Sequence, residues 1–379
     1  MKKRILIDGT PLSRHTDGLS QYIKNVVLRL DTQTYDYTLI VRQGECDNIF
    51  LAQLTQKGIT TEEVNIAPIG PKREWQFYKY LRKNAARFDA AIIPSNQFPI
   101  ALNMPCIYIV HDLIYEDFPE QLGKAAVLKR LFLHFNVAQG IRKATQIVAI
   151  SNHTKNELKK HHNRLQTNKV NVVYEGWEHL QGIDTDGIDA PTEFDRYFIY
   201  VGSSRGHKNL ARLIDAIALA KDKLPANFGF VFVGSLTHLT HTQQQKIDNI
   251  NAQRTLIHFT GWLSEEKLAA YTKQSDALIF PSLSEGFGIP ILEAFYYRLP
   301  LLLSNRTSLP EVAGDAAIYF DPLDTADISE KIVTLATQKN DTAKIKVELG
   351  TERLKQFSWA KTANEIEQIL EKTCQPNTK

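Results

Sequence analysis

Short apolar runs alternate with amphipathic stretches along the whole chain, and this alternation predicts the secondary structure. Runs such as 106–110 (CIYIV) are apolar at every position, as expected of parallel strands that are covered on both faces. Segments such as 210–220 (LARLIDAIALA) instead repeat apolar residues at helical spacing. Strands are expected at 4–8, 37–41, 89–94, 106–110, 146–150, 170–174, 197–202, 228–234, 256–261, 277–281, 300–304 and 317–320.

Strands separated by helices are typical of βαβ units, so the fold class is α/β with parallel, doubly wound sheets. The pattern fades at 176–196, where Gly, Asp and Pro are typical of an interdomain linker. We expect an N-terminal Rossmann-like domain over 1–180 and a C-terminal one over 190–360. A helix in 361–379 is expected to pack back on the first domain. Ligands bind beyond the carboxyl ends of such strands, which predicts a site in a cleft where the two sheets face each other.

Composition and cysteine usage narrow the setting. The chain has 379 residues, 43% hydrophobic and 23% charged, which is ordinary for a globular protein. Three widely spaced cysteines give neither a disulfide framework nor zinc-ligand spacing and favour a reducing compartment. No run reaches the roughly 20 apolar residues that span a bilayer, and the first apolar stretch is too short for a signal peptide. We expect a cytoplasmic protein that is at most peripheral on a membrane.

Charge is unevenly distributed along the chain. Residues 1–180 hold 24 Lys+Arg and 17 Asp+Glu, whereas the remainder holds 21 and 25, although the whole chain carries only +3. Segment 72–88 holds six basic residues, one acid and interleaved aromatic residues. It predicts a helix that faces an anionic membrane surface, with a solvated basic face over core aromatics as the alternative. No motif supports nucleic-acid binding. The aromatic residues are Trp75, Phe77, Tyr78, Tyr80 and Phe88.

The most informative segment is 281–300, PSLSEGFGIPILEAFYYRLP. It places Glu285 in a glycine-rich loop and Glu293 in the first turns of a helix that begins near Pro290. Glycines let backbone amides approach a ligand, and a helix N-terminus favours anionic groups. The two carboxylates can therefore meet one ligand from two points, although an isolated pair of glutamates is more often solvated.

This segment resembles the glutamate–seven residues–glutamate motif of glycosyltransferase family 4, retaining enzymes of GT-B architecture. The carboxylates, glycines, proline and following Leu-Glu-Ala-Phe all fall in register, and the resemblance runs from about residue 4 to 370. The chain is identified as a member of this family. Further segments that agree in order are 7–26, 109–120, 147–158, 200–217, 258–282 and 304–324.

The resemblance implies roles for the C-terminal residues. Glu285 is expected to meet hydroxyls of the donor sugar and Glu293 the ribose, with backbone amides near Phe287 and Gly288 at the sugar or phosphates. Lys208 matches the diphosphate lysine, whose charge offsets that of the leaving group.

The remaining implied residues depend on weaker matches. Arg205 is expected to assist Lys208, or else to be a solvated arginine. Leu263 and Glu265 fall where relatives contact the base, although Glu265 also suits a helix start. His207 is interpreted as a surface replacement.

In the first domain, His111 ends an apolar strand, and relatives place this histidine against the donor sugar as a catalytic group. Its alternative role is a local pair with Asp112. Gly18 matches the loop that approaches the diphosphate. No nucleophile is assigned.

The expected activity is retaining hexosyl transfer from a nucleotide sugar to a glycan acceptor in surface polysaccharide biosynthesis, and this acceptor is expected to be lipid-linked. GDP-mannose is favoured as donor and a UDP-hexose is second, because 285–295 and 304–322 look most like the mannosyltransferase-rich branch. No metal and no other cofactor is expected. The alternatives are a phosphorylase or epimerase of GT-B type and a catalytically silent scaffold subunit. A dehydrogenase is disfavoured because no G-x-G-x-x-G follows the first strand.

Overall fold

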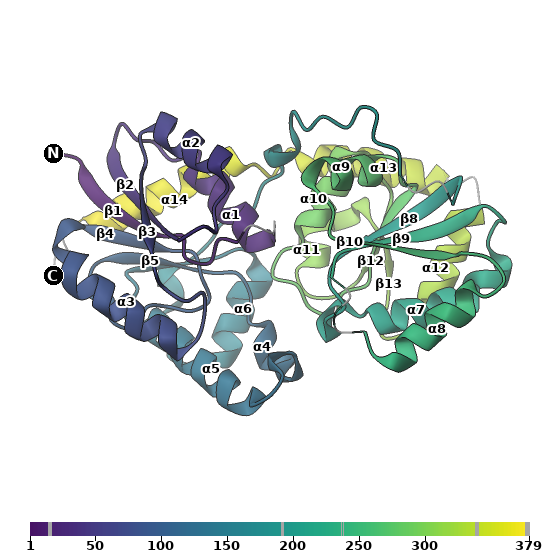
Figure 1. Cartoon of the computed structure of the whole chain (residues 1–379), viewed down its shortest axis with the longest axis horizontal. Helices are drawn as coiled ribbons and strands as arrows, with labels where there is room; N and C mark the ends of the chain where they lie inside the picture. Colours follow the sequence, from purple (N-terminus) through teal and green to yellow (C-terminus); the bar gives the residue numbers. More distant parts are fainter. Residues whose placement is uncertain (14–16, 191–192, 236, 238, 338–340, 376–379) are drawn as a thin grey trace. The chain divides into compact units, whose positions relative to one another are not determined.

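The computed structural model describes residues 1–13, 17–190, 193–235, 237, 239–337 and 341–375. The chain forms two compact units, the first made of Met1–His179 with Ser358–Lys379 and the second of Leu180–Phe357. Within the expected linker 176–196, the chain passes from one unit to the next after His179, and residues 191–192 lie outside the described part. Figure 1 shows a sheet with helices on both faces in each unit.

The first unit is built on a seven-stranded parallel sheet in the order β3-β2-β1-β4-β5-β6-β7. Its strands are β1 (Lys3–Asp8), β2 (Tyr35–Arg42), β3 (Thr60–Val64), β4 (Ala90–Ile93), β5 (Cys106–Val110), β6 (Gln146–Ala149) and β7 (Val170–Val172). Its helices are α1 (Gly18–Val27), α2 (Asn48–Lys57), α3 (Pro71–Asn84), α4 (Ile114–Asp117), α5 (Ala126–Lys143), α6 (Asn152–His161) and α14 (Trp359–Cys374). Short 3₁₀ turns are η1 (Ala85–Arg87), η2 (Pro119–Leu122), η3 (Thr167–Lys169) and η4 (Glu178–Leu180).

The second unit is built on a six-stranded parallel sheet in the order β10-β9-β8-β11-β12-β13. Its strands are β8 (Arg196–Val201), β9 (Phe228–Val233), β10 (Ile257–Gly261), β11 (Ala277–Phe280), β12 (Leu301–Ser304) and β13 (Ile318–Phe320). Its helices are α7 (Leu210–Ala220), α8 (His241–Asn251), α9 (Glu265–Lys273), α10 (Ile289–Tyr296), α11 (Leu309–Ala313), α12 (Thr325–Thr337) and α13 (Asp341–Leu354). The 3₁₀ turns are η5 (Gly206–Lys208), η6 (Lys221–Lys223) and η7 (Gly314–Ala316).

The expected fold class is confirmed, because both sheets are parallel and every expected strand coincides with a strand of the structure. The expectation missed β3, whose sequence TTEEV lacks an apolar run. This strand forms the edge of the first sheet, and none of its residues is fully buried. An edge strand has a neighbouring strand on one side only, so its side chains can remain more exposed and need not be apolar.

The last helix, α14, belongs to the first unit, where it contacts α1 and β5. Its first residue, Trp359, is fully buried, and the backbone N–H of Trp359 donates to the Glu178 carboxylate at 2.7 Å. Ser358 also donates to Glu178 and caps the helix. A Cβ on Gly176 would lie 2.0 Å from the Trp359 nitrogen, so this close approach requires glycine. Residues 376–379 of the expected terminal helix lie outside the described part.

No helix in the described part of the chain combines the length and the apolar character needed to cross a bilayer.

Candidate active site

A buried ion pair lies at the carboxyl edge of the second sheet. Lys208 ends η5 just after β8, and Glu285 follows β11, the neighbouring strand. Nζ of Lys208 donates to Oε1 of Glu285 at 2.6 Å, and the two side chains are only 20% and 11% exposed. The ammonium also lies over the ring of Phe280, 5.3 Å from its centroid. Neighbouring parallel strands thus bring together two residues that are far apart in sequence.

The loop that carries Glu285 is fixed by hydrogen bonds from the following loop. The Ser308 hydroxyl donates to the carbonyls of Glu285 and Phe287 at 2.9 and 3.0 Å. The backbone N–H of Glu285 donates to Oγ1 of Thr307 at 3.2 Å. These bonds orient the backbone, so the Glu285 carboxylate is held in place before any ligand arrives.

Helix α10 begins directly after this loop. Gly288 has a φ of 107°, which favours glycine, and it is the residue that precedes the first turn. Phe287 is buried and packs edge-on against Phe357 at 5.7 Å. Glu293 lies on α10 and is half-buried. Pro290 has no N–H, and the N–H of Ile291 donates to the Gly288 carbonyl at 2.9 Å, so at this end it is the helix dipole that favours an anionic ligand.

The other expected donor-binding residues lie at the same edge of the sheet and nearer to solvent. Arg205 precedes η5 and is exposed. Leu263 follows β10 and is half-buried, whereas Glu265 is exposed and is the first residue of α9. Ser264 caps that helix, so Glu265 also occupies a position where the helix dipole favours a carboxylate.

The interpretation of His207 as a surface residue is wrong. Its side chain is 5% exposed, and burial lowers its pKa to about 4. Its carbonyl accepts from the backbone N–H of Leu283 at 2.7 Å, so it ties η5 to the loop before Glu285. Its burial follows from its place between two sheet-edge loops, which the hydrophobic pattern does not reveal.

In the first unit, His111 follows β5 and is 9% exposed. Its ring contacts Tyr22 edge-on with centroids 4.7 Å apart. Nδ1 lies 3.8 Å from Oε1 of Glu175, and within the described part of the chain Nε2 has no hydrogen-bond partner. The backbone N–H donates to Oδ1 of Asn96 at 3.0 Å. Gly18 is the first residue of α1, and residues 14–16 of the expected loop before it lie outside the described residues.

Comparison with known proteins assigns both units. The model of Glycosyltransferase Family 4 matches residues 16–179, and that of Glycosyl transferases group 1 matches residues 188–348. The chain belongs to glycosyltransferase family 4.

Curated relatives of this family-4 chain include mannosyltransferases. O-antigen chain mannosyltransferase B of Escherichia coli is 31% identical over 163 residues, which cover 43% of the chain and 42% of that protein. The serotype-specific mannosyltransferase WbdA of Escherichia coli is 31% identical over 192 residues, 49% of the chain and 22% of WbdA. O-antigen chain mannosyltransferase RfbU of Salmonella typhimurium is 23% identical over 253 residues, 66% of the chain and 67% of RfbU. The chain therefore matches less than half the length of the first two.

Solved structures show that the family-4 chain has the GT-B fold. Anabaena Alr3699/HepE in complex with UDP and glucose has a TM-score of 0.72 at 16% identity, over 98% of this chain and 100% of that one. WaaG, a glycosyltransferase involved in lipopolysaccharide biosynthesis, has a TM-score of 0.69 at 15% identity, over 97% and 99%.

Sequence reasoning missed Glu175, the carboxyl group beside His111 in the first unit of this family-4 chain. It follows β7 and is 3% exposed. Burial raises its pKa, and the nearby His111 imidazole partly opposes that shift. The position of Glu175 just beyond a strand end was the available signal, because carboxyl ends of parallel strands share one edge.

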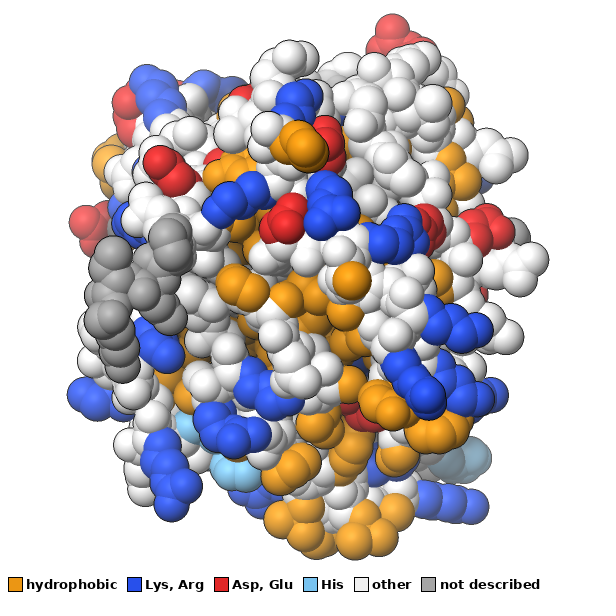
Figure 2. Space-filling view, turned by 90° about the vertical axis from the view of Figure 1, so that its left-hand side faces the viewer, with side chains coloured by type: hydrophobic (Ala, Val, Ile, Leu, Met, Phe, Trp, Pro, Cys, Tyr) orange, Lys and Arg blue, Asp and Glu red, His pale blue; other side chains and the backbone are white. Residues whose placement is uncertain are grey.

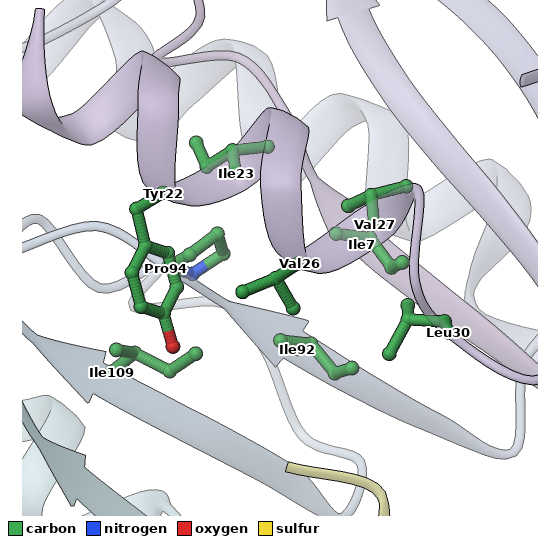
Figure 3. A pocket seen from close by; sticks show the side chains of 9 residues that line it. All are labelled: Ile7, Tyr22, Ile23, Val26, Val27, Leu30, Ile92, Pro94 and Ile109. Carbon is green, nitrogen blue, oxygen red and sulfur yellow. The ribbon is translucent and has the colours of Figure 1, made fainter. Parts of the chain in front are cut away.

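Two features of the family-4 chain do not contribute a ligand site. Figure 3 shows a small gap between α1 and strands β1, β4 and β5, lined by apolar side chains, in which the Tyr22 hydroxyl is the one polar side-chain group. This gap is a packing defect of the core. The expectation that no metal is needed assumed that the sequence has no Asp-x-Asp pair, and this assumption is wrong, because the chain holds Asp184 and Asp186. Both are exposed, and Asp184 accepts from the backbone N–H of Asp186 at 3.0 Å, as in an ordinary turn.

The raised pKa of Glu175 predicts a pH dependence of stability. The folded chain retains the Glu175 proton above pH 4.5, where the unfolded chain releases it, so the free energy of unfolding falls as pH rises through this window. E175Q removes this contribution, so its unfolding free energy relative to wild type should increase as pH rises above 4.5, the ordinary pKa of the group.

Urea unfolding followed by tryptophan fluorescence measures this, since three of the four tryptophans lie in the first unit. E330Q, an exposed carboxylate in the second unit, is the control and should show a pH-independent difference. The same flat difference for E175Q would contradict the prediction.

Proposed function

We propose that the protein transfers a hexosyl group from a nucleotide sugar to a glycan acceptor, with retention of anomeric configuration. The observation that carries the proposal is the Lys208–Glu285 ion pair at 2.6 Å, held at the loop before α10. It supplies a cation and a carboxylate where the family's motif requires a diphosphate site and a sugar site. Family membership of both units supports the same conclusion.

Lys208 and Glu285 neutralise each other while the site is empty. A donor diphosphate offers Lys208 a more highly charged partner, and the leaving nucleoside diphosphate gains further negative charge in the transition state. Glu285 is then free to accept hydrogen bonds from sugar hydroxyls. Arg205, three residues before Lys208 and exposed, adds a second cation for the phosphates.

His111 is proposed to act on the donor sugar through Nε2, the ring nitrogen that has no partner among the described residues. Glu175 is a positioning residue: its carboxyl lies on the Nδ1 side of the ring and favours the tautomer that carries a proton there. Tyr22 fixes the ring plane by its edge-on contact.

GDP-mannose is the donor we favour, because several curated relatives at 23–31% identity are mannosyltransferases. A UDP-hexose is second, since Alr3699/HepE binds UDP and glucose. In the proposed base site, a carboxylate at Glu265 can accept from two N–H groups on one edge of guanine, which uracil does not offer. A thermal-shift panel of GDP, UDP, ADP and their sugars distinguishes them, because a ligand at 100 times its Kd adds about 2.7 kcal/mol.

A lipid-linked acceptor at an anionic membrane is supported by two surfaces of the first unit. On α3, Trp75 and Tyr78 are 57% and 42% exposed and stacked, with Lys79 over Trp75. On α5, one apolar face is exposed; it comprises Val127, Leu128, Leu131 and Phe135. Figure 2 shows hydrophobic side chains gathered at the lower end of this unit among Lys and Arg. Basic groups attract the anionic surface, and apolar groups can enter its headgroup region.

The expected basic segment is only partly available for this role. Arg73 is fully buried and paired with Asp8. Arg87 is exposed, but its charge is paired with that of Glu62. Phe77 and Phe88 lie in the core, so the alternative of core aromatics holds for these two. The exposed basic side chains are Lys72, Lys79, Arg82, Lys83 and Arg87. Free Cys46, Cys106 and Cys374 fit the proposed cytoplasmic location.

Replacement of the two glutamates tests the site. E285A should lower the transfer rate about tenfold to a hundredfold, which corresponds to the free energy of one charge-assisted hydrogen bond. The affinity for the nucleoside diphosphate should stay equal or rise, because Lys208 no longer has Glu285 as a competing partner. E293A should instead weaken nucleoside diphosphate binding by a similar factor. Calorimetry and initial rates measure both effects, with E330A as the surface control. Wild-type behaviour of both variants would refute the assignment.

We further predict that transfer needs no divalent ion. Lys208, Arg205 and the α10 N-terminus provide the positive charge that a metal would otherwise supply to the diphosphate. Initial rates should be unchanged by EDTA and by added manganese. Loss of transfer in EDTA with recovery in manganese would overturn this prediction.

Membrane attachment is tested by vesicle sedimentation. The protein should bind anionic liposomes and bind neutral ones poorly, and binding should fall with salt as the Debye length shrinks from about 10 Å at 0.1 M to about 3 Å at 1 M. Replacing Lys79, Arg82 and Lys83 by Glu should abolish binding and leave nucleotide affinity intact. The matched control replaces Lys223, Lys344 and Lys355, which are exposed in the second unit. Equal losses in both triple variants would contradict a specific surface.

A further inference from the structure

Three side chains of metal-ligand type meet in the first unit, outside the proposed transfer residues. Glu116 lies on α4, His134 on α5, and His162 directly follows the last residue of α6. One ligand atom from each lies within 4.8 Å of the others. Oε1 of Glu116 is 2.6 Å from Nδ1 of His134, and the two histidine rings stack with centroids 4.5 Å apart.

The burial of the polar His162 side chain is not explained by the contacts that the structure describes. The side chain is 7% exposed, and its Nε2 has no hydrogen-bond partner within the described part of the chain. A buried polar atom without a partner is destabilising, and a bound cation would give this nitrogen a partner.

Glu116 is oriented as carboxylate ligands commonly are. It is 5% exposed, and its second oxygen accepts from Nε of Arg130 at 2.9 Å, which leaves the first oxygen directed at the histidines. Metal-ligating carboxylates are often held by such an outer hydrogen bond.

We propose that Glu116, His134 and His162 bind a borderline divalent cation, of which Zn²⁺ is the best fit, with water or another ligand as the fourth donor. Two imidazoles and one carboxylate form a known zinc donor set. Tetrahedral zinc with bonds of about 2.0–2.1 Å places its donors about 3.4 Å apart. Oε1 of Glu116 and Nδ1 of His134, which are 2.6 Å apart, must therefore separate, whereas any ligand atoms near the 4.8 Å limit must approach one another. The His134 side chain is 41% exposed and can make that adjustment.

A neighbouring cluster is a poorer candidate. Asp117, Glu157 and His161 also lie within ligand distance of one another. However, Lys160 is 3.1 Å from Glu157 and 3.5 Å from Asp117, so an ammonium already neutralises both carboxylates. A cation at this second cluster would have to displace that lysine, which makes His161 a matched control for His162.

The proposed ion would connect the short helix α4, helix α5 and the residue that follows α6. Helix α4 begins at Ile114, three residues after His111, and the ion would tie it to α5 and to the end of α6. The ligands take no part in the transfer step proposed above, so the site is structural. The inference does not depend on the proposed function.

The test uses the full-length, untagged protein, prepared metal-free. Zn²⁺ affinity is measured by competition with a chromophoric chelator, and Co²⁺ is used as a spectroscopic probe of tetrahedral N/O coordination. We expect one equivalent of Zn²⁺, binding weakened at least tenfold in E116Q, H134Q and H162Q, and no change in H161Q. Zn²⁺ should raise the unfolding temperature of wild type and of H161Q, and should leave that of H134Q unchanged.

Because His162 is buried, H162Q can fail to fold, and E116Q and the more exposed H134Q then decide the outcome. Wild-type Zn²⁺ affinity in H134Q would overturn the proposal. Loss of binding in H161Q with retention in H134Q would place the ion at the neighbouring cluster and would equally overturn it. Absence of stoichiometric Zn²⁺ binding by wild type has the same consequence.

Discussion

The parallel direction of every strand is the constraint on which the functional geometry depends. In a parallel sheet all carboxyl ends lie at one edge, and residues just beyond them become neighbours whatever their separation in sequence. In the first unit this edge gathers Asp8, His111 and Glu175, and in the second it gathers Lys208 and Glu285. The apolar strands supply the rigid support, since their side chains are covered by helices on both faces.

Charge burial at these edges has a cost that the structure offsets by pairing. Asp8 and Arg73 are both fully buried and form an ion pair, and Asp8 also accepts from the hydroxyl and the N–H of Thr10. An ion left alone in such a place would be strongly destabilising. Arg73 is therefore a structural member of α3, although the sequence places it in a basic run.

How far the sequence determines the result depends on which residues carry the signal. Apolar runs identified the strands whose side chains are buried. The edge strand β3 was missed because none of its residues is fully buried and its sequence TTEEV is mostly polar, whereas the edge strands β7, β10 and β13 keep apolar residues. The local motif around Glu285 and Glu293 identified the loop and α10, since glycine, proline and carboxylate spacing are local features. The pairing of Lys208 with Glu285, the approach of Glu175 to His111 and the burial of His207 are long-range consequences of strand order, which no local pattern encodes. The Glu116–His134–His162 cluster is of the same kind, since its residues come from α4, from α5 and from the position that follows α6.

In the proposed donor site, the Lys208–Glu285 ion pair keeps both charges compensated until a donor diphosphate binds. The two side chains are only 20% and 11% exposed, so each needs a counterion. A dianionic diphosphate can replace Glu285 as partner of Lys208 only by offering more charge, which a neutral sugar does not. Exchange of partners therefore couples phosphate binding to release of the sugar-binding carboxylate. On this argument the nucleotide part of the donor is bound first and prepares Glu285 for the sugar, so a free sugar without the diphosphate should find the carboxylate still occupied.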